Sequence, residues 1–190
     1  MKPLKYVSGM AMAAAVVVAG AGHATTIGGG TITFVGTITD NTCSVEGGAG
    51  TGGGLDDFEV TMDPVKAFSL NGAGTTANAK EFQVIVGGPG QGTCQDGKVA
   101  SMYFLPESPQ VNAVTGNLRN SLPDQSTNVE VQLLKGDMSP INLDQEASGM
   151  QTATIENNTA TLSYFAQYYA TGPATPGLLE TNVMYAVDYN

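Results

Sequence analysis

A segment close to the N-terminus carries the alternating pattern of a strand but has no obvious partner in its own domain. Ile32, Phe34 and Ile38 fall at even positions, Gly36 stands between them, and most of the intervening residues are threonine. This period of two predicts an extended strand with one apolar face, and threonine and isoleucine favour that backbone. The segment follows a run of three glycines, Gly28–Gly30. A strand on such a tether can complete the sheet of another molecule.

The first 24 residues have the layout of a secretory signal peptide. Lys2 and Lys5 give a positive start, and Met10–Ala19 is an apolar run that has the length of a signal-peptide core and is short for a membrane span. Cleavage is predicted after Ala24, with Ala21 as the alternative position. An uncleaved membrane anchor is the competing interpretation, and the lack of a second apolar run or a basic flank argues against it.

Removal of residues 1–24 leaves 166 residues, enough for one domain with a core of its own. We assign residues 25–40 to an N-terminal extension and residues 41–190 to this domain. The mature chain keeps five basic residues against 17 acidic ones, a formal charge of −12. Such a chain repels nucleic acid and anionic lipid, so neither is expected as a partner. The acidic residues are scattered along the sequence, which favours a role in solubility.

The mature chain contains two cysteines, Cys43 and Cys94. An exported chain meets an oxidising compartment, where an even pair is expected to form a disulfide. The bond would close a loop of roughly 50 residues, worth on the order of 4 kcal/mol in the chain-entropy model. Two free thiols and a metal site are the alternatives. The mature chain has no histidine and no third cysteine, which argues against a soft-metal site.

The rest of the chain has the pattern of strands separated by turns, with little helix. Apolar and polar residues alternate in several short runs, bounded by glycine, proline and asparagine. The expected strands are residues 58–62, 81–86, 98–105, 128–134, 159–169 and 180–189, and residues 71–79 are expected to form a loop. About seven strands with turns between them predict an all-β, antiparallel β-sandwich.

The last of these strands ends the chain. Val183, Tyr185, Val187 and Tyr189 share one face, and only Asn190 follows them. A strand in this position normally lies in its sheet and buries one face. The chain therefore begins with a strand-like segment that has no apparent partner and ends with one that the sheet requires.

Five motifs follow one another along the mature chain. They are Thr25–Gly36 leading into Thr42–Val45, Gly92–Cys94 followed by Lys98–Ala100, Asn128–Leu134, Phe165–Gly172 and Tyr185–Asn190. In this order, with the signal peptide and the cysteine pair, they resemble the chaperone–usher pilins of the type 1 fimbrial subunit kind. The glycine-rich segment Gly47–Gly54 and a longer loop before Cys94 depart from the family pattern, and they affect only the expected local geometry.

The resemblance implies an incomplete immunoglobulin-like β-sandwich that lacks its final strand and is completed by a donor strand from a neighbouring subunit. In the family, the gap leaves a hydrophobic groove beside the C-terminal strand. Val183, Tyr185, Val187 and Tyr189 would form that groove strand here. A periplasmic chaperone would first fill the groove and contact this strand.

At the outer-membrane usher, the family replaces the chaperone with the N-terminal extension of the next subunit. The physical process is β-augmentation, in which backbone hydrogen bonds give stability and alternate side chains fill pockets. Ile32, Phe34 and Ile38 would belong to this donor strand. Gly36 would allow a close backbone approach where a side chain would clash.

The function implied is that of a structural subunit of a surface fimbria. The subunit would be exported through the periplasm, polymerise with its own kind head to tail, and support cell adhesion and biofilm formation. The alternative is a minor adaptor or tip subunit with a ligand-binding, adhesin role. Tip adhesins of the family usually carry a lectin domain and lack a donor extension, whereas this chain has the extension and room for one domain.

Nothing in the sequence points to catalysis or to a cofactor. The mature chain has no histidine, no Gly-x-Ser-x-Gly nucleophile motif and no phosphate-binding loop. Asp56, Asp57 and Asp63 could suggest a calcium site, but no EF-hand spacing surrounds them, and solvated loop carboxylates are the simpler interpretation. We therefore expect no enzyme, no metal and no cofactor.

Overall fold

A computed structural model describes residues 43–190 of the chain. The predicted signal peptide and the whole predicted extension lie outside the described residues, and so do Ile32, Phe34, Gly36 and Ile38.

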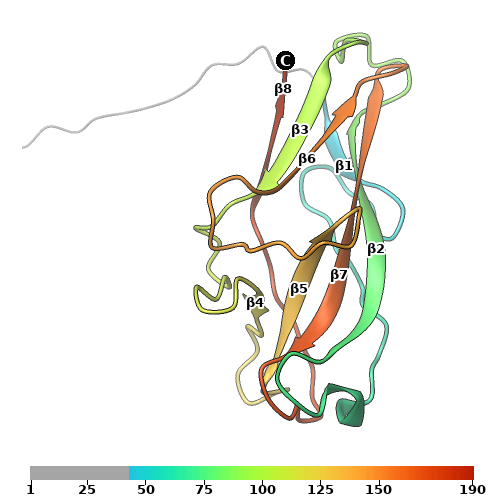
Figure 1. Cartoon of the computed structure of the whole chain (residues 1–190). Coiled ribbons are helices and arrows are strands. Elements are labelled where there is room, and N and C mark those ends of the chain that lie inside the picture. Colours follow the sequence, from blue (N-terminus) through green and yellow to red (C-terminus); the bar gives the residue numbers. More distant parts are fainter. Residues whose placement is uncertain (1–42) are drawn as a thin grey trace, which may run out of the picture. The chain divides into compact units, whose positions relative to one another are not determined.

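The described residues form two antiparallel sheets (Figure 1). The larger sheet has the strand order β1 (Val45–Gly47), β2 (Thr76–Gly87), β7 (Thr159–Ala170), β5 (Val129–Lys135) and β4 (Leu118–Arg119). The smaller sheet has the order β6 (Ser148–Thr154), β3 (Val99–Phe104) and β8 (Tyr185–Tyr189). One short 3-10 helix, η1 (Ala67–Leu70), precedes β2. The expected all-β sandwich is confirmed.

The core lies between the inner faces of the two sheets and follows the alternation of the strands. Every second residue of β2, from Phe82 through Val84 to Val86, is buried, and the same holds for Ala100, Met102 and Phe104 of β3. In β5 and β7, which lie beside β2 in the larger sheet, alternate residues are buried in the same way: Val131, Leu133, Ala160, Leu162, Tyr164 and Ala166. The hydrophobic effect over these facing residues is the main force that holds the sheets together.

Tyr164 stands at the centre of this core. Its ring lies 5.8 Å from the ring of Phe82 and 5.1 Å from that of Phe104, measured between centroids. Its hydroxyl donates a hydrogen bond of 3.1 Å to the carbonyl of Met102 in the opposite sheet. A buried phenol needs such a partner. Burial raises the pKa of Tyr164 well above its ordinary value, because the interior disfavours the charged phenolate.

Cys43 is bonded to Cys94, as the sequence predicts, and the bond ties the residues before β1 to the loop before β3. The sulfur of Cys94 packs against Gly87, which has a φ of 80°. A Cβ at Gly87 would lie 2.6 Å from that sulfur and 2.2 Å from the carbonyl oxygen of Asn158. Both the backbone conformation and the close approach therefore require glycine.

A two-residue hairpin turn leads into β7. Asn157 and Asn158 have φ values of 53° and 62°, and Glu156 and Thr159 exchange two backbone hydrogen bonds across them. Positive φ at both central residues matches the twist of the flanking strands, and asparagine tolerates it. The side-chain amide of Asn158 donates to the carbonyl of Cys94 at 2.8 Å.

The strands expected at residues 81–86, 98–105, 128–134 and 159–169 are confirmed as β2, β3, β5 and β7 within a few residues. The prediction of a loop at residues 71–79 is wrong at its end, because Thr76 and Ala77 already pair with β7. This pairing uses backbone groups, and no side-chain pattern in the sequence indicates it. Of the strand expected at residues 180–189, only Tyr185–Tyr189 is in a sheet, and residues 58–62 pair with no described strand. The short strands β1, β4 and β6 were not expected, since two to seven residues with little apolar alternation give a weak signal.

Candidate strand-binding groove

A groove of about 730 Å³ opens between two extended segments that belong to neither sheet. We call residues 58–62 the first lip and residues 178–184 the second lip. Core side chains from both sheets line the groove between them: Phe82, Met102, Phe104, Val131, Leu133 and Ala166. The core of the sandwich is therefore reached from outside along this line.

The first lip alternates like a strand. Phe58, Val60 and Met62 are partly buried against the core, while Glu59 and Thr61 are exposed. The second lip alternates in the same way: Leu179, Thr181 and Val183 are half-buried and line the groove, and the residues between them are exposed. Each lip thus turns one set of alternate side chains to the floor of the groove and the other set to solvent.

Among the described residues, the backbone edges that face the groove have no hydrogen-bond partners. In the second lip, the hydrogen-bonded backbone groups belong to Leu178, Glu180 and Met184. Within the described part of the chain, the N–H and C=O groups of Leu179, Thr181 and Val183 make no hydrogen bond. In strand geometry, alternate residues point their backbone groups to opposite sides. The second lip is therefore fastened on its outer edge and open on the edge toward the groove.

The first lip is open in the same sense. The carbonyl of Glu59 accepts a bond of 2.8 Å from the N–H of Gly52, and it is the one backbone group of residues 58–62 that is hydrogen-bonded among residues 43–190. The hydroxyl oxygen of Thr181, in the opposite lip, is buried and likewise has no partner among these residues. Buried polar groups without partners are rare in proteins. The groove therefore holds unsatisfied donors and acceptors on both sides.

The lips meet at one end of the groove, at Tyr185. The rings of Tyr185 and Phe58 lie 5.7 Å apart, and the hydroxyl of Tyr185 donates a hydrogen bond to the backbone carbonyl of Asp56. Burial, and then the negative charges of Asp56 and Asp57, raise the pKa of Tyr185 above its ordinary value. The phenol therefore stays protonated, as a donor must be.

The rim of the groove is acidic. Among the described residues, the charged ones that line it are Asp56, Asp57, Glu59 and Glu180, and none of them is a lysine or an arginine. The floor and the inner faces of the lips are apolar. This combination fits an extended apolar segment that brings no negative charge, and it offers no group of three His, Cys, Asp or Glu side chains in the described residues for a metal ion.

The residues predicted for the C-terminal strand occupy two different places. Val183 and Tyr185 line the groove. Val187 and Tyr189 lie in β8, opposite Met102 and Ala100 of β3, and pack against the main core. All four pack against the main core.

Other residues of the site were not singled out by the sequence. Phe58, Val60 and Met62 were recognised as alternating but assigned to an ordinary strand. Leu179 and Thr181 continue the alternation of the last strand toward its beginning, and that extension of the pattern was the signal available for them.

Comparison with known proteins assigns the chain to a family. The profile of the type-1 fimbrial protein A family, FimA, matches residues 62–190. The chain belongs to this family. It is 36% identical to the major fimbrial subunit SMF-1 of Stenotrophomonas maltophilia, over 85% of this chain and 92% of that protein. It is 34% identical to an F17 fimbrial protein of Escherichia coli, over 84% of this chain and 87% of that protein.

The fold of the subunit agrees with this family. A chain in a solved structure of a chaperone–usher pilus superposes with a TM-score of 0.56 and covers 88% of the subunit and 99% of that chain, at 17% identity. The sandwich is thus the incomplete immunoglobulin-like fold of these pilins.

The protein is therefore a fimbrial subunit of the chaperone–usher class, and its family and fold are those of structural pilins and not of enzymes. Its relatives are named as a fimbrial protein and a major fimbrial subunit. Within the described residues, no helix is both long and apolar enough to cross a membrane.

Proposed function

We propose that the subunit polymerises by donor-strand exchange, with residues 25–40 of one copy lying in the groove of the next. The observation that carries this proposal is the pair of facing lips, whose backbone groups toward the groove have no partner among the described residues and lie above the core side chains that line it. A strand laid between them would satisfy both edges at once. Residues 1–24 are removed on export in this proposal, and residues 41–190 form the domain that receives the strand.

The composition of the extension supports this role. Ile32, Phe34 and Ile38 would point into the groove, and Gly36 would lie where the backbone must come close. Each such side chain contributes roughly 1.5–3 kcal/mol when it is buried, and each backbone hydrogen bond adds about 1 kcal/mol. Residues 25–38 carry no charged side chain, so they meet the acidic rim without repulsion.

The same groove implies that a chaperone binds the subunit during export. An open apolar groove of this size promotes aggregation when nothing covers it. A periplasmic chaperone would fill it by contact with the strand that contains Val183, Tyr185, Val187 and Tyr189, and an outer-membrane usher would exchange the chaperone strand for the extension. The subunit would then reach the cell surface as part of a fimbria that supports adhesion and biofilm formation.

The contact is head to tail, so it leaves one free extension and one free groove at the ends of every oligomer and propagates into a filament. We assign the subunit to the shaft of that filament. The similarity to SMF-1, which is named a major fimbrial subunit, favours this position over that of a minor adaptor or tip subunit. Immunogold labelling along the whole filament is the expected result, and labelling confined to the tip would show the adaptor role.

Substitution in the extension tests the donor role. Phe34→Asp places a charge in the apolar groove and should prevent filament formation, while a soluble complex of the subunit with its chaperone still accumulates. Thr33→Asp is the matched control, because the neighbouring side chain points to the opposite face of the strand. Its filaments should be close to normal in number and length by electron microscopy.

A peptide of residues 25–40 provides the second test. It should raise the midpoint of thermal unfolding of the monomeric subunit, because it binds the folded state and not the unfolded one. Normal fimbriae from the Phe34→Asp variant, or no stabilisation by the peptide, would contradict donor-strand exchange.

A further inference from the structure

Neither lip lies in a sheet, and the groove runs between them. The lips present apolar side chains to the core residues that line the groove between them, so the hydrophobic effect favours their collapse into the groove. Tyr185 joins them at one end. Along the rest of their length, something on the outer side of each lip must keep the two apart.

The second lip is held from outside by the side chain of Asn120. Its amide nitrogen donates to the carbonyls of Leu178, at 2.9 Å, and Ser126, at 3.0 Å. Its amide oxygen accepts from the N–H groups of Leu122 and Glu180, both at 3.1 Å. A side-chain amide can donate two hydrogen bonds and accept two, and Asn120 makes all four. One amide thus fastens the lip to the loop of residues 121–126.

The neighbours of Asn120 reinforce this attachment on the same edge. The backbone N–H and the hydroxyl of Ser121 both donate to the carbonyl of Glu180, at 2.8 and 2.9 Å. The side-chain oxygen of Gln125 accepts from the N–H of Leu178 at 3.1 Å. Every one of these bonds goes to the outer edge of the lip, so none uses a backbone group that faces the groove.

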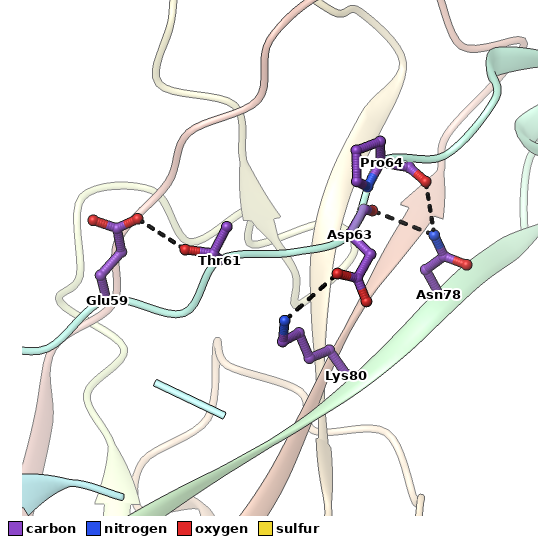
Figure 2. Close-up of polar contacts among 6 residues, drawn as sticks. All are labelled: Glu59, Thr61, Asp63, Pro64, Asn78 and Lys80. Atoms are coloured by element: carbon purple, nitrogen blue, oxygen red, sulfur yellow. Dashed lines mark hydrogen bonds and ion pairs between the residues drawn. The ribbon is translucent and has the colours of Figure 1, made fainter. Parts of the chain in front are cut away.

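The first lip is held by Asn78, which lies at a bulge in β2 (Figure 2). The residue has a φ of 52°, and the register of β2 against β7 shifts between Ala77 and Lys80. A bulge redirects a side chain out of the regular alternation. The amide nitrogen of Asn78 reaches the carbonyls of Asp63, at 3.3 Å, and Pro64, at 3.1 Å, directly after the first lip.

An ion pair lies beside this attachment. Lys80 and Asp63 approach to 3.6 Å between Nζ and Oδ1. The side chain of Asp63 is 75% exposed, and exposed pairs of this kind contribute little to stability. The amide of Asn78 is therefore the stronger fixed point of the first lip.

We propose that Asn120 and Asn78 are positioning residues that hold the two lips apart and keep the groove ready for a strand. The proposal rests on the proposed function, since it treats a strand as the occupant. Preorganisation of this kind removes a cost that an entering strand would otherwise meet, because a groove that is mostly closed binds with an affinity reduced by the fraction that is open. Loss of either amide should therefore slow the entry of a strand.

The distance between the lips tests the proposal without any occupant. Glu59 and Asn182 are exposed on opposite lips and can be replaced by cysteine and labelled with nitroxide probes, since Cys43 and Cys94 are bonded to each other. In the monomeric mature chain, pulsed electron resonance should give one narrow distance distribution. Asn78→Gly, which keeps the backbone conformation and removes the amide, should shift this distribution to shorter distances and broaden it.

Asn120→Leu should have the same effect from the other side. If this variant does not fold, Asn120→Asp is the milder test, because it keeps the two accepted bonds and loses the two donated ones. Asn158→Gly is the control for Asn78→Gly. Asn158 also has a positive φ and a side-chain amide that donates to a backbone carbonyl, but it lies at the hairpin before β7. An unchanged distance distribution in the Asn78 and Asn120 variants would overturn the proposal.

Binding kinetics supply a second readout. The peptide of residues 25–40 should associate with the Asn78→Gly and Asn120→Asp subunits about 10-fold more slowly than with the wild type and dissociate at an unchanged rate. A faster dissociation with unchanged association would show that the amides act on the filled groove instead, and would overturn the proposal. If the wild type binds no peptide, donor-strand exchange fails, and the lip distance still decides the role of the two asparagines.

Discussion

The hydroxyl of Tyr185 donates a hydrogen bond to the backbone carbonyl of Asp56, and its ring packs 5.7 Å from the ring of Phe58. The two contacts join the C-terminal half of the chain to the segment that follows β1, across the end of the groove. Tyr185 directly follows the second lip and Phe58 begins the first, and both side chains also pack against the core. The pair therefore fixes where the groove ends.

Tyr185→Phe separates these two contacts. The substitution keeps the ring beside Phe58 and removes the hydrogen bond to Asp56, so the free energy of unfolding should fall by about 0.5–1.5 kcal/mol. Urea unfolding at pH 7 measures this change. Tyr169→Phe is the matched control, because the hydroxyl of Tyr169 makes no hydrogen bond to the described residues, and its unfolding free energy should stay the same. Equal losses in both variants would argue that the bond to Asp56 has no energetic role.

The alternation of apolar and polar residues was sufficient to predict the strands that pair with their neighbours over many residues. β2 and β7 pair in register from Lys80 to Gly87, and their apolar residues repeat with a period of two that predicts a strand. The same alternation occurs in Phe58, Val60 and Met62, which were expected to form a strand and pair with none of the described strands. The pattern reports which face is buried. It does not report whether a neighbouring backbone is present, because that depends on distant parts of the fold.

The groove was expected because of the resemblance to pilins, and Val183 and Tyr185 were named on that ground. The residues that hold its lips could not have been found in this way. Asn120 bonds to Leu178, 58 residues away, and Asn78 bonds to Asp63, 15 residues away. Asparagine is common in loops for local reasons, and nothing in the neighbouring residues marks an amide that makes long-range bonds.

The stability of the sandwich should fall steeply in alkaline solution. Tyr164 is buried, and its pKa in the folded state is raised above the 10.0 of an ordinary tyrosine. Its neutral form therefore contributes stability that is complete below pH 10 and is lost as the pH rises beyond it, because the unfolded chain then releases a proton that the folded chain keeps. One such proton corresponds to about 1.4 kcal/mol for each pH unit.

Tyr164→Phe should remove the contribution of this one phenol proton to the pH dependence of the unfolding free energy. At pH 7 the variant should be less stable by about 1 kcal/mol, since it loses the hydrogen bond to Met102. Between pH 10 and pH 11 the difference from the wild type should shrink, because only the wild type keeps the phenol proton. Urea titrations across this range measure both effects, and parallel curves for the two proteins would rule out Tyr164 as a source of the alkaline loss.

The disulfide between Cys43 and Cys94 should be a large part of the stability of the subunit. The two residues are separated by 51 positions, so the bond closes a long loop in the unfolded chain, and its loss should cost about 4 kcal/mol. Replacing both cysteines by serine should lower the urea midpoint accordingly. Non-reducing peptide mass spectrometry of the exported protein should detect the linked pair, and two thiols that alkylate in the native protein would contradict it.

Glu130 in β5 is a buried acidic residue, with 6% of its surface exposed. Its oxygens accept hydrogen bonds from the side chains of Asn112 at 2.5 Å, Thr115 at 2.6 Å and Asn117 at 3.3 Å. Among the described residues no lysine or arginine forms a salt bridge with it. A carboxylate that accepts from several neutral donors is held by those donors, and it holds their loop in return.

Glu130→Gln tests this dependence because it keeps the size and shape of the side chain. The new amide nitrogen is a donor that faces other donors, so at least one buried group loses its partner, and unfolding should become easier by about 1–3 kcal/mol. Glu81→Gln is the control, since Glu81 is an exposed carboxylate on β2, and its variant should be within about 0.5 kcal/mol of the wild type. Hydrogen exchange at residues 112–117 should speed up in the Glu130 variant alone. If both variants unfold at the same urea concentration, the loop does not depend on the buried carboxylate.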